Sequence, residues 1–128
     1  MTRTVQNFID GKLADALSGR RSELINPSTG EVFGTAPVSG PEDVDAAYRA
    51  AGKAFESWRD TTPSERQRAL LKFADAMEDR AEEIIAAESE NTGKPIELTR
   101  TEEIPPALDQ IRFFAGAARV LEGRSAGE

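Results

Sequence analysis

Cysteine and histidine are both absent from the 128 residues of this sequence. Their absence excludes disulfide bonds, thiol nucleophiles, imidazole bases and the usual zinc ligand sets from this stretch of chain. The sequence also lacks a glycine-rich phosphate-binding loop and a Gly-x-Ser-x-Gly motif. Chemistry based on a carboxylate or a lysine is what remains open.

Long apolar runs are missing as well. No run approaches the roughly 20 residues of a membrane span, and the first residues, MTRTVQNFIDGK, lack the apolar stretch of a signal peptide. We therefore expect a cytoplasmic protein without a membrane partner.

Positive charge is in deficit, and the net charge is −7. Residues 1–38 are neutral, so the whole acidic excess lies in residues 39–128. The acids are spread along predicted helices, a pattern typical of solvated helix surfaces. Because an acidic surface repels phosphate backbones, we expect no nucleic-acid partner.

The sequence does contain enough apolar residues, 38%, for one compact domain with a modest core. Two patterns meet near residue 39. Before it, Asp10-Gly11 lies between apolar residues and predicts a type I′ hairpin, whose two turn residues need positive φ. The segment NPSTGE, residues 26–31, predicts a second turn, because Pro27 presets φ and Gly30 accepts the left-handed conformation. We expect antiparallel strands over residues 5–38.

After residue 39 the apolar residues recur every three or four positions, which is the period of a helix. The first predicted helix begins at Gly40-Pro41, and its inner face consists of Val44, Ala47, Tyr48, Ala51, Phe55 and Trp58. On this face Tyr48 and Trp58 are predicted to pack in a hydrophobic core. A capping box formed by Thr62 and Glu65 predicts the start of the second helix. Its expected inner face is Leu70, Phe73, Ala74 and Met77.

The third predicted helix covers residues 81–90. It ends at Gly93, a left-handed cap, and before Pro95, which forbids continuation. A fourth helix is predicted to start near Pro105-Pro106 and to bury Leu108, Ile111, Phe114 or Ala115, Ala118 and Leu121. The predicted fold class is α+β, with N-terminal antiparallel β-hairpins followed by four to five helices. Residues 122–128 carry no cap or packing signal, which predicts a chain truncated at residue 128.

Several short motifs follow one another along the chain. They are Phe8-Ile9-Asp10-Gly11, Asn26-Pro27-Ser28-Thr29-Gly30-Glu31, Glu42-Asp43-Val44-Asp45-Ala46-Ala47, Ala54-Phe55-x-x-Trp58, Arg66-x-x-x-Leu70-Leu71, Glu88-x-x-x-Thr92-Gly93-Lys94-Pro95 and Arg112-Phe113-Phe114-Ala115-Gly116. In this order and at this spacing they resemble the N-terminus of NAD(P)-dependent aldehyde dehydrogenases. Within that family, Glu102-Glu103-Ile104-Pro105 followed by Arg112-Phe113-Phe114-Ala115-Gly116-Ala117-Ala118-Arg119 is similar to the γ-aminobutyraldehyde dehydrogenases.

The resemblance implies that the chain is the N-terminal fragment of a larger α/β enzyme. Residues 1–38 would be the β-hairpin segment, and residues 39–128 a helical segment flanking the NAD-binding domain. The family's nucleophilic cysteine, general-base glutamate and dinucleotide-binding residues would all lie beyond residue 128. The fragment itself would therefore contain no catalytic and no cofactor-binding residue. The parent would use NAD or NADP, oxidise a small aldehyde to the carboxylate and form a homo-oligomer, a tetramer or a dimer.

The resemblance also places four substrate-binding candidates near the start of the fourth helix. Glu103 would attract the ammonium group of an ω-aminoaldehyde, and Asp109 would second it, while Pro106 and Gln110 would line the substrate tunnel. The simpler interpretation is that Glu102 and Glu103 favour the N-terminus of the helix, since acids suit that end of the dipole.

A monovalent cation site is a further implication of the resemblance. The carbonyl of Ile25, just before the NPSTGE turn, and the side chain of Asn91 would be its ligands. Asn91 keeps an oxygen ligand but lacks the charge of the aspartate that often stands there. The simpler interpretation is that Asn91 satisfies the end of the third helix. Lys94 is predicted to compensate exposed carbonyls at that helix end. Arg112 and Arg119 are predicted to form helix-surface or interdomain ion pairs.

Three alternatives stay open at this point. The first is that the parent belongs to another substrate class of the same family, such as betaine aldehyde or succinate semialdehyde dehydrogenases. The second is a stand-alone helical interaction module that binds through its apolar helix faces. The third alternative is an acidic helical domain whose resemblance is accidental.

Overall fold

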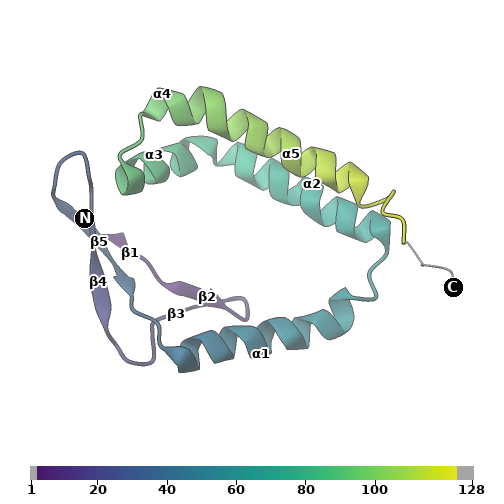
Figure 1. Cartoon of the computed structure of the whole chain (residues 1–128), viewed down its shortest axis with the longest axis horizontal. Helices are drawn as coiled ribbons and strands as arrows, with labels where there is room; N and C mark the ends of the chain where they lie inside the picture. The colour runs from purple at the N-terminus through teal and green to yellow at the C-terminus, as the bar shows by residue number, and fades with distance from the viewer. Residues whose placement is uncertain (1–2, 124–128) are drawn as a thin grey trace, which may run out of the picture. The chain divides into compact units, whose positions relative to one another are not determined.

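A computed structural model describes residues 3–123 of the chain. It contains β1 (Arg3–Thr4), β2 (Asn7–Ile9), β3 (Lys12–Ala14), β4 (Arg21–Ile25), β5 (Val32–Pro37), α1 (Pro41–Trp58), α2 (Pro63–Asp79), α3 (Ala81–Thr92), α4 (Ile96–Leu98), the π-helical turn η1 (Thr99–Glu103) and α5 (Ile104–Ala117) (Figure 1). This order of strands and then helices confirms the predicted α+β class.

The described residues form two compact units. One, which we call the strand unit, comprises residues 3–60 and 90–93; the other, the helical unit, comprises residues 61–89 and 94–123. Within the described residues no helix combines the length and the apolar character that a membrane crossing requires.

Both predicted turns of the strand unit are confirmed. In the β2–β3 hairpin Asn7 pairs with Ala14, and the turn residues Asp10 and Gly11 have φ of 52° and 74°. The second turn joins β4 to β5, which pair in antiparallel fashion. There Gly30 has a φ of 74°, and its N–H donates to the Asn26 carbonyl at 2.8 Å. Local turn chemistry therefore determines both connections.

A parallel strand was not predicted. β1 pairs in parallel with β5, which gives a three-stranded sheet of order β1-β5-β4. The two residues of β1 are too few to show a period in the sequence. Gly34 of β5 explains the close approach, because a Cβ at this position would lie 2.6 Å from the carbonyl oxygen of Arg3. The glycine leaves room for the neighbouring backbone.

The start of α1 is fixed by Asp43, a buried carboxylate. Its Oδ2 accepts from the Gly40 N–H at 2.8 Å, and its Oδ1 accepts from the Leu17 N–H at 2.9 Å. The first bond satisfies an orphan donor at the helix N-terminus. The second ties the loop after β3 to the helix.

The predicted inner face of α1 is exposed, so the core role predicted for Tyr48 and Trp58 is wrong for this chain. The Tyr48 side chain is 76% exposed, and Val44, Phe55 and Trp58 are also exposed. The helical period was identified correctly. Burial, however, requires another surface packed closely against the helix; within the strand unit β2 contacts α1, yet Val44, Tyr48, Phe55 and Trp58 stay exposed.

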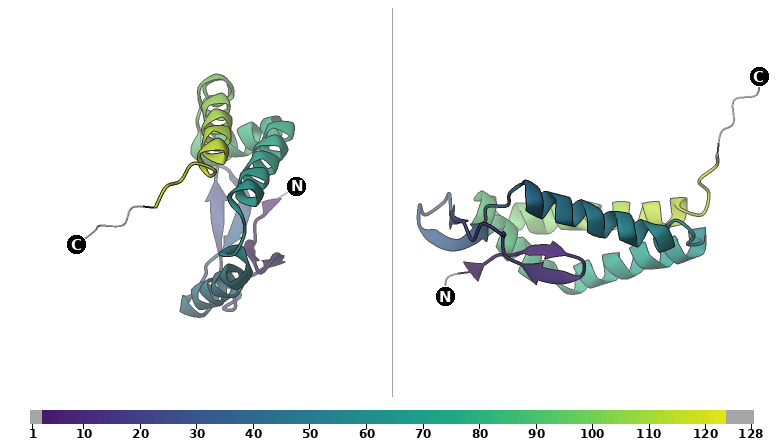
Figure 2. Two further views of the ribbon diagram at one scale, coloured as in Figure 1. Left: turned by 90° about the vertical axis from the view of Figure 1, so that its right-hand side faces the viewer. Right: turned by 90° about the horizontal axis from the view of Figure 1, so that it is seen from below.

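The helical unit has the core that the strand unit lacks. Ala74 of α2, Ile85 of α3, and Ile104 and Leu108 of α5 are buried together, and Met77, Ala81, Ile84 and Ile111 pack against them. Figures 1 and 2 show α5 alongside α2, in agreement with their contacts. Two predicted core positions are wrong, because Phe73 is 58% exposed and Leu121 lies at the surface. Of the pair Phe114 or Ala115, the buried residue is Ala115.

The predicted caps at the start of α2 and after the end of α3 are confirmed. Thr62 Oγ1 accepts from the Glu65 N–H at 3.3 Å, and Glu65 Oε2 accepts from the Thr62 N–H at 2.7 Å. Directly after the last residue of α3, Gly93 adopts a φ of 75°, the left-handed conformation predicted for it. The two signals are local in sequence, which is why they could be recognised.

The last helical stretch begins earlier than predicted. Helical backbone starts at Ile96, passes through η1 and continues into α5, so Pro105 and Pro106 stand inside it. The Ile104 N–H donates to the Thr99 carbonyl, five residues back. Prolines lack an N–H and cannot extend the ordinary bonding ladder. The wider π turn lies immediately before them.

Candidate functional site

Glu103, the predicted ammonium receptor, already binds a cation of this chain. Lys94 Nζ donates to Glu103 Oε1 at 2.7 Å and to Oε2 at 2.9 Å. The same ammonium donates to Glu88 Oε1 at 3.2 Å. The hydrogen bond to Glu103, followed by that to Glu88, raises the pKa of Lys94 above its usual range. Lys94 therefore stays charged and offsets the charge of Glu103.

Sequence reasoning missed this role of Lys94, which was expected to compensate helix carbonyls. Lys94 follows the end of α3, while Glu103 is the last residue of η1. The contact arises because the chain between them turns through α4 and η1. No local signal marks a pair nine residues apart across such a turn.

The other substrate candidates lie on α5. Pro106 and Gln110 are exposed, and their spacings of three and seven residues from Glu103 place all three on one side of a helix. Asp109 lies six residues from Glu103, about a third of a turn away from that side. By ideal helix spacing Pro106 lies about 60° around the axis from Glu103, and Asp109 lies about 60° beyond Pro106, at the edge of this group.

Asp109 lines a shallow hollow of about 370 Å³ in the helical unit, together with Glu78, Ala81, Ile104, Pro105, Leu108 and Arg112. The Arg112 guanidinium donates to Asp75 Oδ1 at 3.1 Å and also to Glu78 Oε2. The bond to Glu78, followed by that to Asp75, raises the pKa of Arg112 further above its usual range. This confirms Arg112 as a helix-surface ion-pair residue. The hollow is lined by apolar side chains of α3 and α5 and by the charged side chains of Glu78, Asp109 and Arg112.

The two cation candidates, Ile25 and Asn91, both belong to the strand unit. Ile25 ends β4, and Asn91 lies near the end of α3. Their segments meet, since a Cβ on Gly93 would lie 2.9 Å from Pro27 Cγ, and Arg3 pairs with Glu90 at 3.2 Å. The Asn26 Oδ1 is engaged by the Ser28 N–H at 2.9 Å. Among residues 3–123, no group of three or more Asp and Glu side chains is arranged to hold a metal ion.

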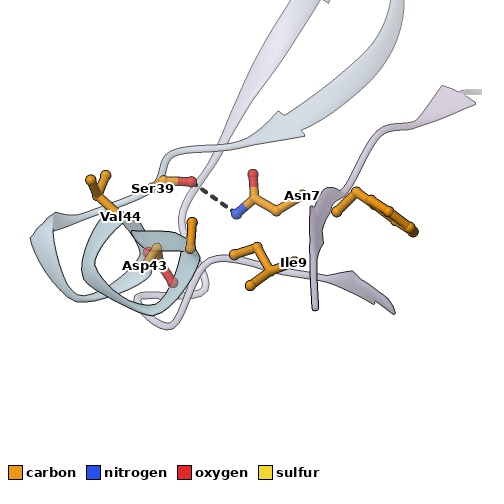
Figure 3. Close-up of a pocket in the computed structure, with 7 residues that line it drawn as sticks. Asn7, Ile9, Ser39, Asp43 and Val44 are labelled. Carbon is orange, nitrogen blue, oxygen red and sulfur yellow. Dashed lines mark hydrogen bonds between the residues drawn. The ribbon is translucent and has the colours of Figure 1, made fainter. Parts of the chain in front are cut away.

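A second hollow, of about 250 Å³, lies between β2 and α1 in the strand unit and was not predicted. Its lining is Asn7, Phe8, Ile9, Ser39, Asp43, Val44 and Ala47. Figure 3 shows the Asn7 side chain pointing toward Ser39, whose Oγ accepts from Asn7 Nδ2 at 2.9 Å. Backbone N–H groups of Gly40 and Leu17 lower the pKa of Asp43 below its usual range. These polar groups join the hairpin to the helix and are engaged with one another.

Comparison with known proteins identifies the chain's relatives. The sequence pattern of the aldehyde dehydrogenase family matches residues 14–128. Human 2-aminomuconic semialdehyde dehydrogenase is 43% identical over 114 residues, which cover 89% of this chain and 23% of that protein. The chain spans about a quarter of the length of the relatives it matches.

Solved structures agree with the sequence match. An NAD-dependent aldehyde dehydrogenase from Sinorhizobium meliloti superposes with a TM-score of 0.89 at 39% identity, over 97% of this chain and 25% of that one. A γ-glutamyl-γ-aminobutyraldehyde dehydrogenase from Burkholderia cenocepacia J2315 gives a TM-score of 0.89 at 34% identity, over 96% of this chain and 25% of that one. With the family pattern matching nearly all of its residues, the chain belongs to the aldehyde dehydrogenase family.

Proposed function

We propose that the complete protein containing these residues oxidises an aldehyde to the carboxylate with a nicotinamide cofactor. The observation that carries this proposal is the family match over residues 14–128, supported by the fold of an NAD-dependent relative. The chemistry would be covalent, with a cysteine thiolate attacking the aldehyde. This chain contains no cysteine, so its contribution is structural and, at α5, substrate-lining.

The residues of this chain do not fit a dinucleotide site. The sequence has no glycine-rich loop between a strand and a helix of the kind that holds a pyrophosphate. We therefore assign the cofactor, NAD or NADP, to residues outside this chain. A homo-oligomeric state of the complete protein is part of the same proposal.

The substrate we propose is an ω-aminoaldehyde such as γ-aminobutyraldehyde. The support is the segment from Glu102 to Arg119 and the γ-glutamyl-γ-aminobutyraldehyde dehydrogenase among the structural relatives. Glu103 would face the ammonium group of the substrate and would share its carboxylate with Lys94. Pro106 and Gln110, on the same side of α5, would contact the aliphatic part.

A substrate panel on the complete protein tests this function. Aminobutyraldehyde, betaine aldehyde, succinate semialdehyde and butyraldehyde would each be assayed with NAD and with NADP. We expect the highest kcat/KM for aminobutyraldehyde. The Glu103→Gln variant should raise KM for aminobutyraldehyde more than for neutral butyraldehyde, because only the former loses a charge-assisted contact. Equal changes for both aldehydes would contradict the role of Glu103.

A monovalent cation held by the Ile25 carbonyl and Asn91 remains part of the proposal. The meeting of the two segments at Gly93 and Pro27 supports it. The test compares the thermal midpoints of the complete protein in a potassium salt and in the salt of a bulky organic cation. Asn91→Asp adds a charged ligand, so it should widen the gain in thermal midpoint that potassium gives over the organic cation. Identical thermal midpoints in the two salts for both proteins would contradict it.

A further inference from the structure

Lys94 holds together two carboxylates from different helical segments. Its ammonium lies within 3.2 Å of an oxygen of Glu88 on α3 and within 2.9 Å of both oxygens of Glu103 at the end of η1. The Lys94 side chain is 30% exposed. By contrast, the Arg80 side chain, which pairs with Glu83 in the same unit, is 68% exposed. The Lys94 cluster is therefore less screened by water than an ordinary surface pair.

The Lys94 cluster lies at the junction between η1 and α5, where the backbone hydrogen-bonding ladder changes. Glu103 is the last residue of a π turn, a rare conformation that occurs mostly as single turns inside α-helices and is frequent at functional sites. The next residue, Ile104, is buried in the core, and the two prolines that follow cannot donate backbone hydrogen bonds. The ladder is therefore interrupted where α5 begins, and the side chain of Glu103 supplies a tether at that point.

We propose that Lys94 is a positioning residue that fixes η1 and thereby the first turns of α5. This inference rests on the proposed function, because the face of α5 that is positioned carries Pro106 and Gln110, the proposed substrate wall. Without the ammonium, Glu88 and Glu103 would be like charges gathered at one point, and they would repel each other. Loss of Lys94 thus removes a tether and adds a repulsion, both acting on η1.

The test uses the complete protein and two independent measurements. Hydrogen exchange followed by mass spectrometry reports the opening of residues 96–104, and steady-state kinetics report KM and kcat for butyraldehyde and aminobutyraldehyde. Lys94→Gln should accelerate exchange in this segment about tenfold, the size expected from losing a charge-assisted hydrogen bond. KM should rise about fivefold or more for both aldehydes, with kcat within about twofold, because binding geometry and not chemistry is disturbed.

Three variants control the experiment. Lys94→Arg keeps the charge and should restore exchange and KM to within about twofold of the original protein. Glu88→Gln, which removes one partner and the repulsion, should have a smaller effect and serves if Lys94→Gln does not fold. Arg80→Gln breaks the exposed pair with Glu83 in the same unit and should change neither measurement.

The outcomes separate this inference from the proposed function. Unchanged exchange and KM in folded Lys94→Gln would overturn the positioning role, as would an equal effect of Arg80→Gln or a Lys94→Arg protein that restores neither reading. A complete protein that oxidises no aldehyde with either cofactor would refute the proposed function. In that case the exchange of residues 96–104 would still decide whether Lys94 fixes η1.

Discussion

The two units use apolar side chains differently. In the helical unit, α2, α3 and α5 enclose Ala74, Ile85, Ile104 and Leu108. In the strand unit, α1 has a regular apolar stripe, yet Val44, Tyr48 and Phe55 on it are exposed. The strand unit is instead held by backbone ladders, by Asp43 and by tight turns. The same helical period therefore indicates a core in one unit and an uncovered surface in the other.

The largest expected effect comes from the core of the helical unit. Leu108→Ala should lower the free energy of unfolding by about 2–5 kcal/mol, because it removes a buried side chain and leaves a cavity. Urea titration measures the change. The matched control is Leu121→Ala, the same substitution at an exposed position, which should cost less than about 0.5 kcal/mol. Similar losses for both would show that the unit lacks a specific core.

The next effect lies in the strand unit, where backbone geometry carries the stability. Gly93→Ala should destabilise by about 1–3 kcal/mol, because its φ of 75° strains a residue with a side chain and the new Cβ would press on Pro27. Gly30→Ala has nearly the same φ but open space around the new Cβ. The difference between the thermal midpoints of the two variants isolates the contact with Pro27. Equal thermal midpoints would mean that the backbone strain of a positive φ alone destabilises both variants.

A smaller loss is expected at the cap of α2. Thr62→Ala should lower the stability of the helical unit by about 1 kcal/mol, because the Glu65 N–H loses its acceptor. Thr62→Ser keeps the hydroxyl and is the control. If the two variants unfold at the same urea concentration, the cap does not contribute and packing alone sets the stability of this unit.

Acid should weaken both units, through Asp43 in the strand unit and through Glu65, Glu78 and Glu82 in the helical unit. Bonds from Gly40 and Leu17 lower the pKa of Asp43, and the bonds from Thr62 lower that of Glu65. A lowered folded pKa means that the stabilisation is complete above the ordinary carboxyl range and disappears as pH falls through the folded pKa. In a plot of thermal midpoint against pH, Asp43→Asn and Glu65→Gln should each make the fall at acid pH less steep. An unchanged fall in both variants would assign acid sensitivity to other carboxylates.

The smallest effect is expected on the exposed stripe of α1. Tyr48→Ser should change the stability of the 128-residue chain by less than about 0.5 kcal/mol, since the side chain is already in water. Repeating the substitution in the complete protein sharpens the comparison. A loss there that is absent from the shorter chain would identify Tyr48 as a residue covered by other parts of the protein. Equal, small effects would leave the stripe as a free surface.

Local signals were predictable from the sequence, and non-local ones were not. Asp10-Gly11, Gly30, Gly93 and the Thr62–Glu65 cap each depend on a few neighbouring residues, and all were identified. The exposure of Tyr48 depends on which surface packs against α1, and the helical period of the sequence carries no information about that surface. The parallel pairing of β1 joins segments far apart in the chain.

The candidate site shows the same limit. The motifs identified the family and pointed to Glu103, but the partner of Glu103 depends on how the chain turns through α4 and η1. The two prolines predicted a helix start, whereas the backbone is already helical at Ile96. A proline indicates which bonds cannot form, but the prolines alone did not predict the π turn before them.

The packing of Gly93 against Pro27 has a consequence for the order in which the chain folds during synthesis. The strand unit takes its final segment, residues 90–93, from beyond residues 61–89, which belong to the helical unit. During synthesis the first 60 residues emerge early, but the unit can close only after the intervening helices have left the ribosome. A cut after residue 60 would therefore separate the strand unit from its own last piece, so genetic division of this chain should not follow its linear halves.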